Sequence, residues 1–192
     1  LVDTFEHAKT FGSLIQIPYA LKTHLAVLPE ALALVKQSGD MYATAAAEDL
    51  LPLVQQAQVL AMQFDAVVAN PPYMGGKGMN LQMRDFAASI FPDTKSDVFA
   101  MFMERCQGFG RATASVGFVT PYVWMFISSY ELTRLKLISE ASIQNLIQLE
   151  YNAFEPACVP VCCFVVGKSH IDNYSGSYIK LSDFKGHENQ SP

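Results

Sequence analysis

The sequence has little charge and lacks the patterns that define several common classes of protein. Only 16% of its 192 residues are charged, and no apolar run is long enough to span a bilayer. The start carries no signal peptide, and no glycine loop ends in the Gly-Lys-Ser/Thr sequence that cradles nucleotide phosphates. These absences argue against membrane-spanning, secreted and P-loop proteins, and we expect a cytoplasmic protein without a membrane partner.

Cysteines are few, and their spacing is not that of a metal site. Cys106, Cys158, Cys162 and Cys163 lie in apolar surroundings and lack the two-pair spacing of a zinc site. We therefore expect reduced core cysteines and no metal. The net charge of −5 is unfavourable for a DNA-binding protein, so a basic groove must be local or be supplied by another domain.

Apolar residues, in contrast, are abundant and make up 51% of the chain. In a chain of this length, that share suits one domain with a packed core. The first residue is Leu1 rather than Met, so we expect the chain to begin inside a longer protein.

The most informative stretch is an apolar run, residues 64–69, that ends abruptly in Asn70-Pro71-Pro72-Tyr73. The run is rich in valine and alanine and is followed by breaker residues, which predicts a buried strand. Neither proline can donate a hydrogen bond to a sheet, and Pro71 keeps Asn70 out of the helical region. The result is a stiff turn at the carboxyl end of a strand, where ligands bind in open α/β sheets.

The chemistry of this turn suits a planar amino group. The Asn70 side-chain carbonyl and the Pro71 backbone carbonyl are two fixed acceptors, which match the two protons of one NH2 group. Tyr73 adds a flat face for a planar ring. The alternative is a proline-rich turn that merely happens to carry Asn and Tyr; the strand before it and the glycines after it weaken that alternative.

The tetrapeptide after an apolar strand resembles the catalytic motif of S-adenosylmethionine-dependent amino-methyltransferases, above all the DNA adenine-N6 class. The wider stretch, from Gln55 to Gly76, is similar to the adenine-specific methyltransferases of BREX phage-defence systems (PglX). The resemblance covers most of the chain and is strongest from about Leu50 to Lys168. It implies an α/β, partial Rossmann-like methyltransferase fold, with a mostly parallel sheet, a last antiparallel strand and helices on both faces.

The resemblance also implies a mechanism, which is direct methyl transfer from S-adenosyl-L-methionine to a flipped adenine. Asn70, Pro71, Pro72 and Tyr73 would form the catalytic motif, and Tyr73 and Phe154 would stack on the two faces of the base. Phe154 takes this role because it lies in the loop before the last strand, where the family carries an aromatic residue.

Further contacts follow from the same resemblance. Phe102 and Pro72 would contact the cofactor, although Phe102 is alternatively a plain core residue. Lys77, Arg84 and Lys95 would contact DNA phosphates, or are solvated loop cations. Double-stranded DNA is the expected partner, together with other phage-defence proteins.

Three segments are expected. Residues 1–63 form a mainly helical segment with a short strand, residues 64–168 the catalytic half of the methyltransferase domain, and residues 169–192 the truncated start of a following segment. The family's glycine-rich cofactor loop is not found, because Gly108-Phe109-Gly110 lies at a helix end. We therefore expect the cofactor-binding half to precede Leu1 and a target-recognition region to follow Pro192.

Periodicity and breaker residues predict the remaining elements. They are a short strand at 14–17, helices at 29–39, 41–62 and 96–109 (the last capped by Ser96), a polar loop at 74–96, and strands at 115–121, 143–149, 159–167 and 178–181. A helix from Ser128 should have a capping box with Glu131 and should bury Leu132, Leu135 and Ile138.

Other functions stay open at this point. The same tetrapeptide occurs in enzymes that methylate a glutamine of translation release factors, and relatives of these enzymes modify guanine in ribosomal RNA. Cytosine-N4 methyltransferases usually have Ser or Asp in place of Asn70. The chain could also be a catalytically incomplete DNA-binding fragment, which we expect to bind S-adenosylmethionine weakly or not at all.

Overall fold

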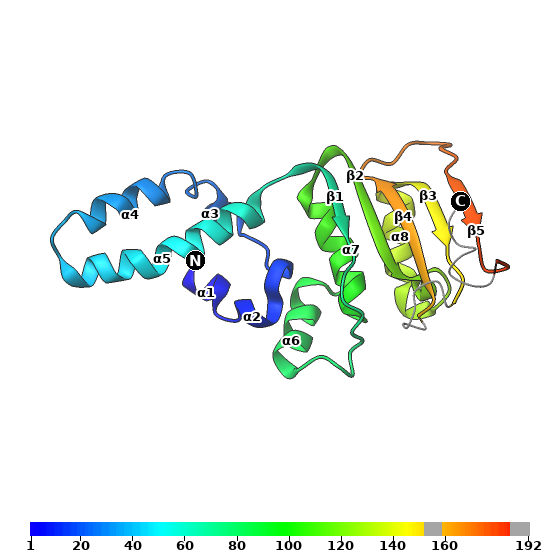
Figure 1. Ribbon diagram of the computed structural model, residues 1–192, viewed down its shortest axis with the longest axis horizontal. Helices are drawn as coiled ribbons and strands as arrows, with labels where there is room; N and C mark the ends of the chain where they lie inside the picture. Colours follow the sequence, from blue (N-terminus) through cyan, green and yellow to red (C-terminus); the bar gives the residue numbers. More distant parts are fainter. Residues whose placement is uncertain (152–158, 185–192) are drawn as a thin grey trace. The chain divides into compact units, whose positions relative to one another are not determined.

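The structure, a computed structural model, describes residues 1–151 and 159–184. The chain divides into two compact units, Leu1–Met62 and Gln63–Pro192 (Figure 1). The first unit consists of helices and turns, whereas the second contains a β-sheet with helices. Among the described residues, no helix combines the length and the hydrophobicity needed to cross a bilayer.

The first unit is organised by its two longest helices. Its elements are α1 (Val2–Phe5), α2 (Ala8–Phe11), the 3-10 turn η1 (Gly12–Leu14), α3 (Tyr19–Lys22), α4 (Leu28–Lys36) and α5 (Met41–Ala61). Asp40 caps α5 by accepting from the backbone N–H groups of Tyr42 and Ala43. Gly39, at a φ of +78°, makes the turn before it, and Pro52 lies within α5 without ending it.

The strand that we expected at residues 14–17 is wrong. Gly12–Leu14 form η1 instead, and Ile15 and Ile17 are buried with Phe5 in a small core among the helices. All residues of the first unit are described, and none of them forms a strand, so this segment has no strand to pair with. The alternating apolar residues therefore pack against helices rather than in a sheet.

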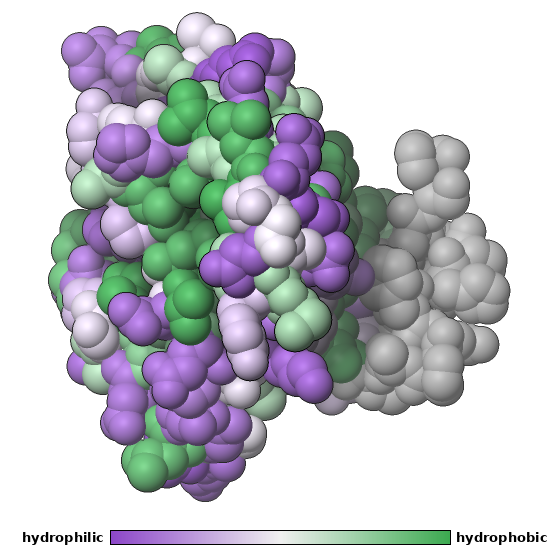
Figure 2. All heavy atoms as spheres, turned by 90° about the vertical axis from the view of Figure 1, so that its left-hand side faces the viewer, coloured by the Kyte–Doolittle hydropathy of each residue, from purple (hydrophilic) through white to green (hydrophobic). Residues whose placement is uncertain are grey.

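The α4–α5 pair leaves much of its apolar surface in contact with solvent. α4 has no buried residue, Leu34 is 65% exposed, and Tyr42 in α5 is 83% exposed. On the face that it presents, Figure 2 shows apolar side chains among polar ones. Two helices alone therefore do not bury their apolar faces.

The second unit is built on a five-stranded sheet with the order β1-β2-β4-β3-β5. Its strands are β1 (Phe64–Ala69), β2 (Gly110–Pro121), β3 (Ser142–Gln148), β4 (Val161–Gly167) and β5 (Ser177–Lys180). β1 pairs in parallel with β2 and β3 with β5, whereas β4 runs antiparallel to both of its neighbours. Four strands run one way and β4 the other, which confirms the α/β class with an antiparallel strand.

Helices cover one face of this sheet. α7 (Val98–Phe109) packs on β1 and β2, and α8 (Glu131–Glu140) packs on β3; η2 (Tyr122–Met125) and η3 (Ser128–Tyr130) precede α8. The main core lies between these helices and the sheet. Its buried residues include Phe99, Met103, Val116, Phe118, Leu137, Phe164 and Val166.

The opposite face of the sheet is less covered. Val68 of β1 lies there beside Gly117 and Val165, and Val68 is 85% exposed. Helices on both faces were expected, but none of the described residues buries the sheet at Val68.

Two local expectations are corrected around α7. The expected loop at residues 74–96 contains a helix, α6 (Leu81–Ile90), which begins because the Asn80 side chain accepts from the Met83 N–H. The cap of α7 is Asp97 and not Ser96. The Ser96 hydroxyl donates instead to the backbone carbonyl of Ser129, so it does not cap the helix.

The buried face of α8 was also predicted wrongly. Thr133 and Leu137 are buried, whereas Leu132, Leu135 and Ile138 are each more than half exposed. Thr133 and Leu137 are spaced by one turn, so they present one face, and that face packs on the core. The expected capping box with Ser128 does not form, because η3 precedes the helix and Tyr130 takes the cap position.

Candidate active site

The Asn70-Pro71-Pro72-Tyr73 turn lies where the sequence predicts it, directly after β1. Ala69 ends β1 beside Phe118, and the parallel strand β2 continues to Pro121 at the same edge of the sheet. Asn70 is exposed and Tyr73 is 39% exposed, whereas Pro71 is buried and anchors the turn. The polar group and the ring that we expected to meet a ligand therefore both reach solvent.

Tyr73 is held by contacts at both ends of its side chain. Its hydroxyl donates to the Asn70 side-chain oxygen at 3.3 Å and lies 3.4 Å from the Val119 carbonyl oxygen. Its ring meets the Phe99 ring edge-to-face, with centroids 6.3 Å apart. Burial raises the pKa of Tyr73, so the hydroxyl stays protonated at neutral pH and acts as a donor.

These contacts orient the carboxamide of Asn70. The Tyr73 hydroxyl donates to Asn70 Oδ1 and so holds this oxygen in place. The oxygen keeps a second lone pair, which can accept a hydrogen bond from a ligand. Asn70 and Tyr73 are thus brought together, as the sequence predicts. Tyr73 has a further role that the sequence did not reveal, which is to fix the acceptor.

Asp97 is a site residue that the sequence reasoning missed. Its carboxylate accepts from the backbone N–H groups of Met74, at 2.9 Å, and Phe99, at 3.2 Å, and the Val98 N–H donates to the Met74 carbonyl oxygen at 3.1 Å. Burial raises the pKa of Asp97, and the backbone N–H donors oppose that rise. One carboxylate therefore caps α7 and ties it to the residue that follows the Asn70–Tyr73 turn.

The three predicted phosphate contacts lie after this turn. Lys77 and Lys95 are exposed in loops. Arg84 lies on α6, and its Nε–H donates to the Gly76 carbonyl oxygen at 3.0 Å, so this arginine also shapes the loop. Their contacts with DNA stay a prediction.

The two predicted aromatic contacts differ in what the structure says of them. Phe102 is half-buried on α7 and packs against the main core, so its contact with a cofactor stays a prediction. Phe154 lies outside the described residues. Val161, the first residue of β4, pairs with Pro121 at the edge that carries Asn70.

The cysteines in the described residues are thiols of the interior. Cys106 and Cys162 are buried, and burial raises the pKa of each to about 11. In the part of the chain that the structure describes, no three His, Cys, Asp or Glu side chains are placed to hold a metal ion.

Comparison with known proteins identifies the family. Residues 27–154 match the family model described as the Eco57I restriction-modification methylase, so the chain belongs to this family. The match includes the Asn70 turn, Asp97 and the position of Phe154.

Two curated relatives are similar over most of the chain. The chain is 40% identical over 182 residues to the adenine-specific methyltransferase BrxX of Escherichia coli O9:H4 (strain HS), which is 93% of this chain and 15% of BrxX. It is 34% identical over 139 residues to the adenine-specific methyltransferase PglX of Lacticaseibacillus casei (strain Zhang), which is 71% of this chain and 12% of PglX. The chain thus spans less than a sixth of either relative.

Solved structures support the fold. The Type ISP restriction-modification enzyme LlaGI, in complex with a DNA substrate mimic, superposes on 79% of this chain with a TM-score of 0.57 and 14% identity, over 14% of its own length. A putative class I S-adenosylmethionine-dependent methyltransferase of Listeria monocytogenes superposes on 94% of this chain and 71% of its own, with a TM-score of 0.50 and 11% identity. The fold of this chain is therefore similar to the folds of these two solved structures.

The described residues do not supply a full binding site for S-adenosyl-L-methionine. Gly108-Phe109-Gly110 joins α7 to β2 rather than a strand to a helix. A Cβ added at Gly110 would lie 2.9 Å from the Cβ of Ala114, so strand packing requires this glycine. The residues at the carboxyl edge fit the acceptor side of a methyl transfer and do not fit the whole cofactor.

Proposed function

We propose that this chain is the part of an adenine-specific DNA methyltransferase that holds and polarises the target amino group. The observation that carries the proposal is the exposed carboxamide of Asn70, oriented by Tyr73 at the carboxyl edge of the sheet. The names of BrxX and PglX support the same reaction. A phage-defence or restriction-modification system is the setting that these names suggest.

The chemistry begins from a poor nucleophile. The exocyclic nitrogen of adenine shares its lone pair with the ring, so it attacks weakly. Asn70 Oδ1 and the Pro71 carbonyl oxygen accept the two N–H protons and draw them out of the ring plane, which localises the lone pair on nitrogen. This is electrostatic preorganisation, because the prolines hold both acceptors before the base arrives.

The target base must leave the duplex to reach this turn. Tyr73 offers one face for stacking and Phe154 would offer the other, with a contribution of about 1–3 kcal/mol for each base–aromatic stack. Lys77, Arg84 and Lys95 follow the turn in sequence and would contact the phosphates of the double-stranded DNA that flanks the flipped base.

S-adenosyl-L-methionine supplies an electrophilic methyl group when it is bound. In this chain, Pro72 and Phe102 are the residues that would contact it, while its glycine-rich loop would come from residues of a longer protein, as would the region that recognises the DNA sequence.

The test is the change Asn70→Ala in the full-length protein, with N6-methyladenine in DNA as the measured product. Loss of one preorganised hydrogen-bond partner should lower the methylation rate by about 10²–10³-fold and leave DNA affinity nearly unchanged. Gln82→Ala, which removes another exposed carboxamide, on α6, is the control and should keep the wild-type rate. Undiminished methylation by Asn70→Ala would refute the assigned role.

A further inference from the structure

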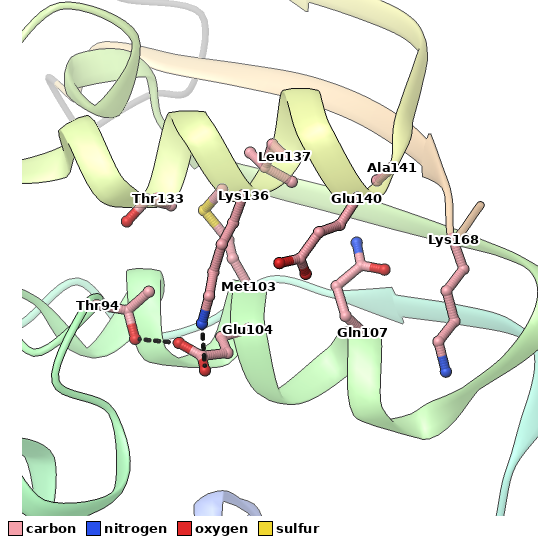
Figure 3. Close-up of a pocket in the computed structure, with 10 residues that line it drawn as sticks. All are labelled: Thr94, Met103, Glu104, Gln107, Thr133, Lys136, Leu137, Glu140, Ala141 and Lys168. Carbon is pink, nitrogen blue, oxygen red and sulfur yellow. Dashed lines mark hydrogen bonds and ion pairs between the residues drawn. The ribbon is translucent and has the colours of Figure 1, made fainter. Parts of the chain in front are cut away.

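A cavity of about 270 Å³ lies between α7 and α8, and none of the four residues of the catalytic turn lines it (Figure 3). Its apolar wall includes Met103 of α7 and Leu137 of α8. Lys168, which follows β4, closes one end. The cavity therefore belongs to the helix layer and is not the site described above.

One part of the cavity wall is already satisfied by its own contacts. The Glu104 carboxylate accepts from the Thr94 hydroxyl at 2.9 Å and from the Lys136 ammonium at 3.1 Å. Lys136 also lies 3.3 Å from a carboxylate oxygen of Asp93. The polar groups of this cluster bond to one another, so they are not available to bind a ligand.

Two buried polar groups in another part of the wall lack hydrogen-bond partners within the part of the chain that the structure describes. Gln107 Nε2 and Thr133 Oγ1 are buried, and among the described residues neither has a hydrogen-bond partner. Thr133 is only 3% exposed. In Figure 3, the Gln107 amide and the Glu140 carboxylate reach toward one another from facing helices, although no hydrogen bond joins them. Buried donors without partners are uncommon in native proteins and call for a ligand or water.

The charges and size of the wall define the missing molecule. Glu104 and Glu140 balance Lys136 and Lys168, so the lining has no net charge and disfavours a charged ligand. The buried groups without partners are the Gln107 amide and the Thr133 hydroxyl, and the carboxylate of Glu140, an exposed residue, lines the cavity beside them. The volume lies below the range of about 300–1,000 Å³ that is typical for drug-sized ligands.

We propose that this cavity binds a small net-neutral zwitterion of amino-acid size. Its ammonium group would donate to Glu140, and its carboxylate would accept from Gln107 Nε2. Its side chain would run along Met103 and Leu137 toward Thr133, so a polar end group on that side chain would satisfy the Thr133 hydroxyl. Such a ligand would bridge α7 and α8.

Ligand-observed NMR titration of the purified protein tests this proposal, with L-glutamine as the probe. L-glutamine should bind with a Kd of about 1 mM or tighter. L-glutamate and L-lysine, which carry net charge, should bind at least about tenfold more weakly. Absence of L-glutamine binding would mean that water alone fills the cavity and would overturn the proposal.

Two variants and a control locate the binding. Glu140→Gln and Gln107→Met should each weaken L-glutamine binding by about tenfold or more. Glu131→Gln, at the first turn of the same helix and outside the cavity lining, should bind as the wild type does. Equal affinity in all three variants, or tighter binding of L-glutamate than of L-glutamine, would overturn the proposal.

Discussion

Asp97 ties α7 to Met74, directly after the Asn70–Tyr73 turn, so its removal should loosen this turn locally. The change Asp97→Ala removes the acceptor of the Met74 and Phe99 N–H groups. An N-cap contributes about 1 kcal/mol, and a hydrogen bond to a charged group about 1.5–3 kcal/mol. Burial of the Asp97 carboxylate has a desolvation cost, which also raises its pKa. Asp97→Ala removes this cost, and that gain offsets part of the loss. We therefore expect a net local loss of about 2 kcal/mol, or about 30-fold in an opening equilibrium.

Native-state hydrogen exchange of the Met74 amide measures this loss directly. Exchange should be about 30-fold faster in Asp97→Ala and close to wild type in Asp97→Asn, because Asn keeps an acceptor oxygen at the cap. Asp40→Ala is the matched control, since it removes a solvent-exposed cap in the first unit and should leave the Met74 amide unchanged. Equal exchange of Met74 in wild type and Asp97→Ala would refute the coupling.

Three further predictions concern the core, the thiols and DNA. Phe164→Ala should lower the free energy of unfolding by about 3–5 kcal/mol in urea denaturation, because Phe164 is 1% exposed and contacts two aromatic rings. The pKa of the Cys162 thiol rises from 9.0 to about 11 in the folded protein; stability should therefore fall as pH rises from about 9 to 11, since the unfolded chain ionises first, and this fall should be smaller in Cys162→Ala. Lys77→Ala in the full-length protein should reduce the slope of log K for DNA against log salt by about 1, whereas Lys22→Ala should not change it.

Strong local signals in the sequence predicted the strands and the catalytic turn. The apolar run before Asn70 forms a strand that stops at two prolines, and β2, β3 and β4 also end near their breaker residues. The expectation that this first strand is buried is wrong, because β1 is an edge strand and none of its residues is buried. Cross-strand pairing was less visible, because which strands are neighbours depends on contacts far apart in sequence. The placement of β5 beside β3, for instance, has no local signal.

The errors have a common physical cause, which is that tertiary contacts choose between locally equivalent patterns. Residues 14–17 alternate as a strand would, but with no partner strand they pack among helices. On α8, Leu132, Leu135 and Ile138 offered one apolar face, and the core took the face of Thr133 and Leu137 instead. Asp97 lies in the helix predicted at 96–109, and only the fold reveals its bond to Met74.

The central position of β4 has a consequence for how this protein is made. β4 lies between β2 and β3 and is synthesised after both, and β2 and β3 are not paired with each other in the sheet. While residues 161–167 are still within the ribosome, the nascent chain holds the β1–β2 pair and an unpaired β3, and the strand edges that β4 later joins are open. The edge beside Asn70 is therefore completed late in translation, and a chain that stalls before Val161 should be a substrate for chaperones rather than an early form of the folded unit.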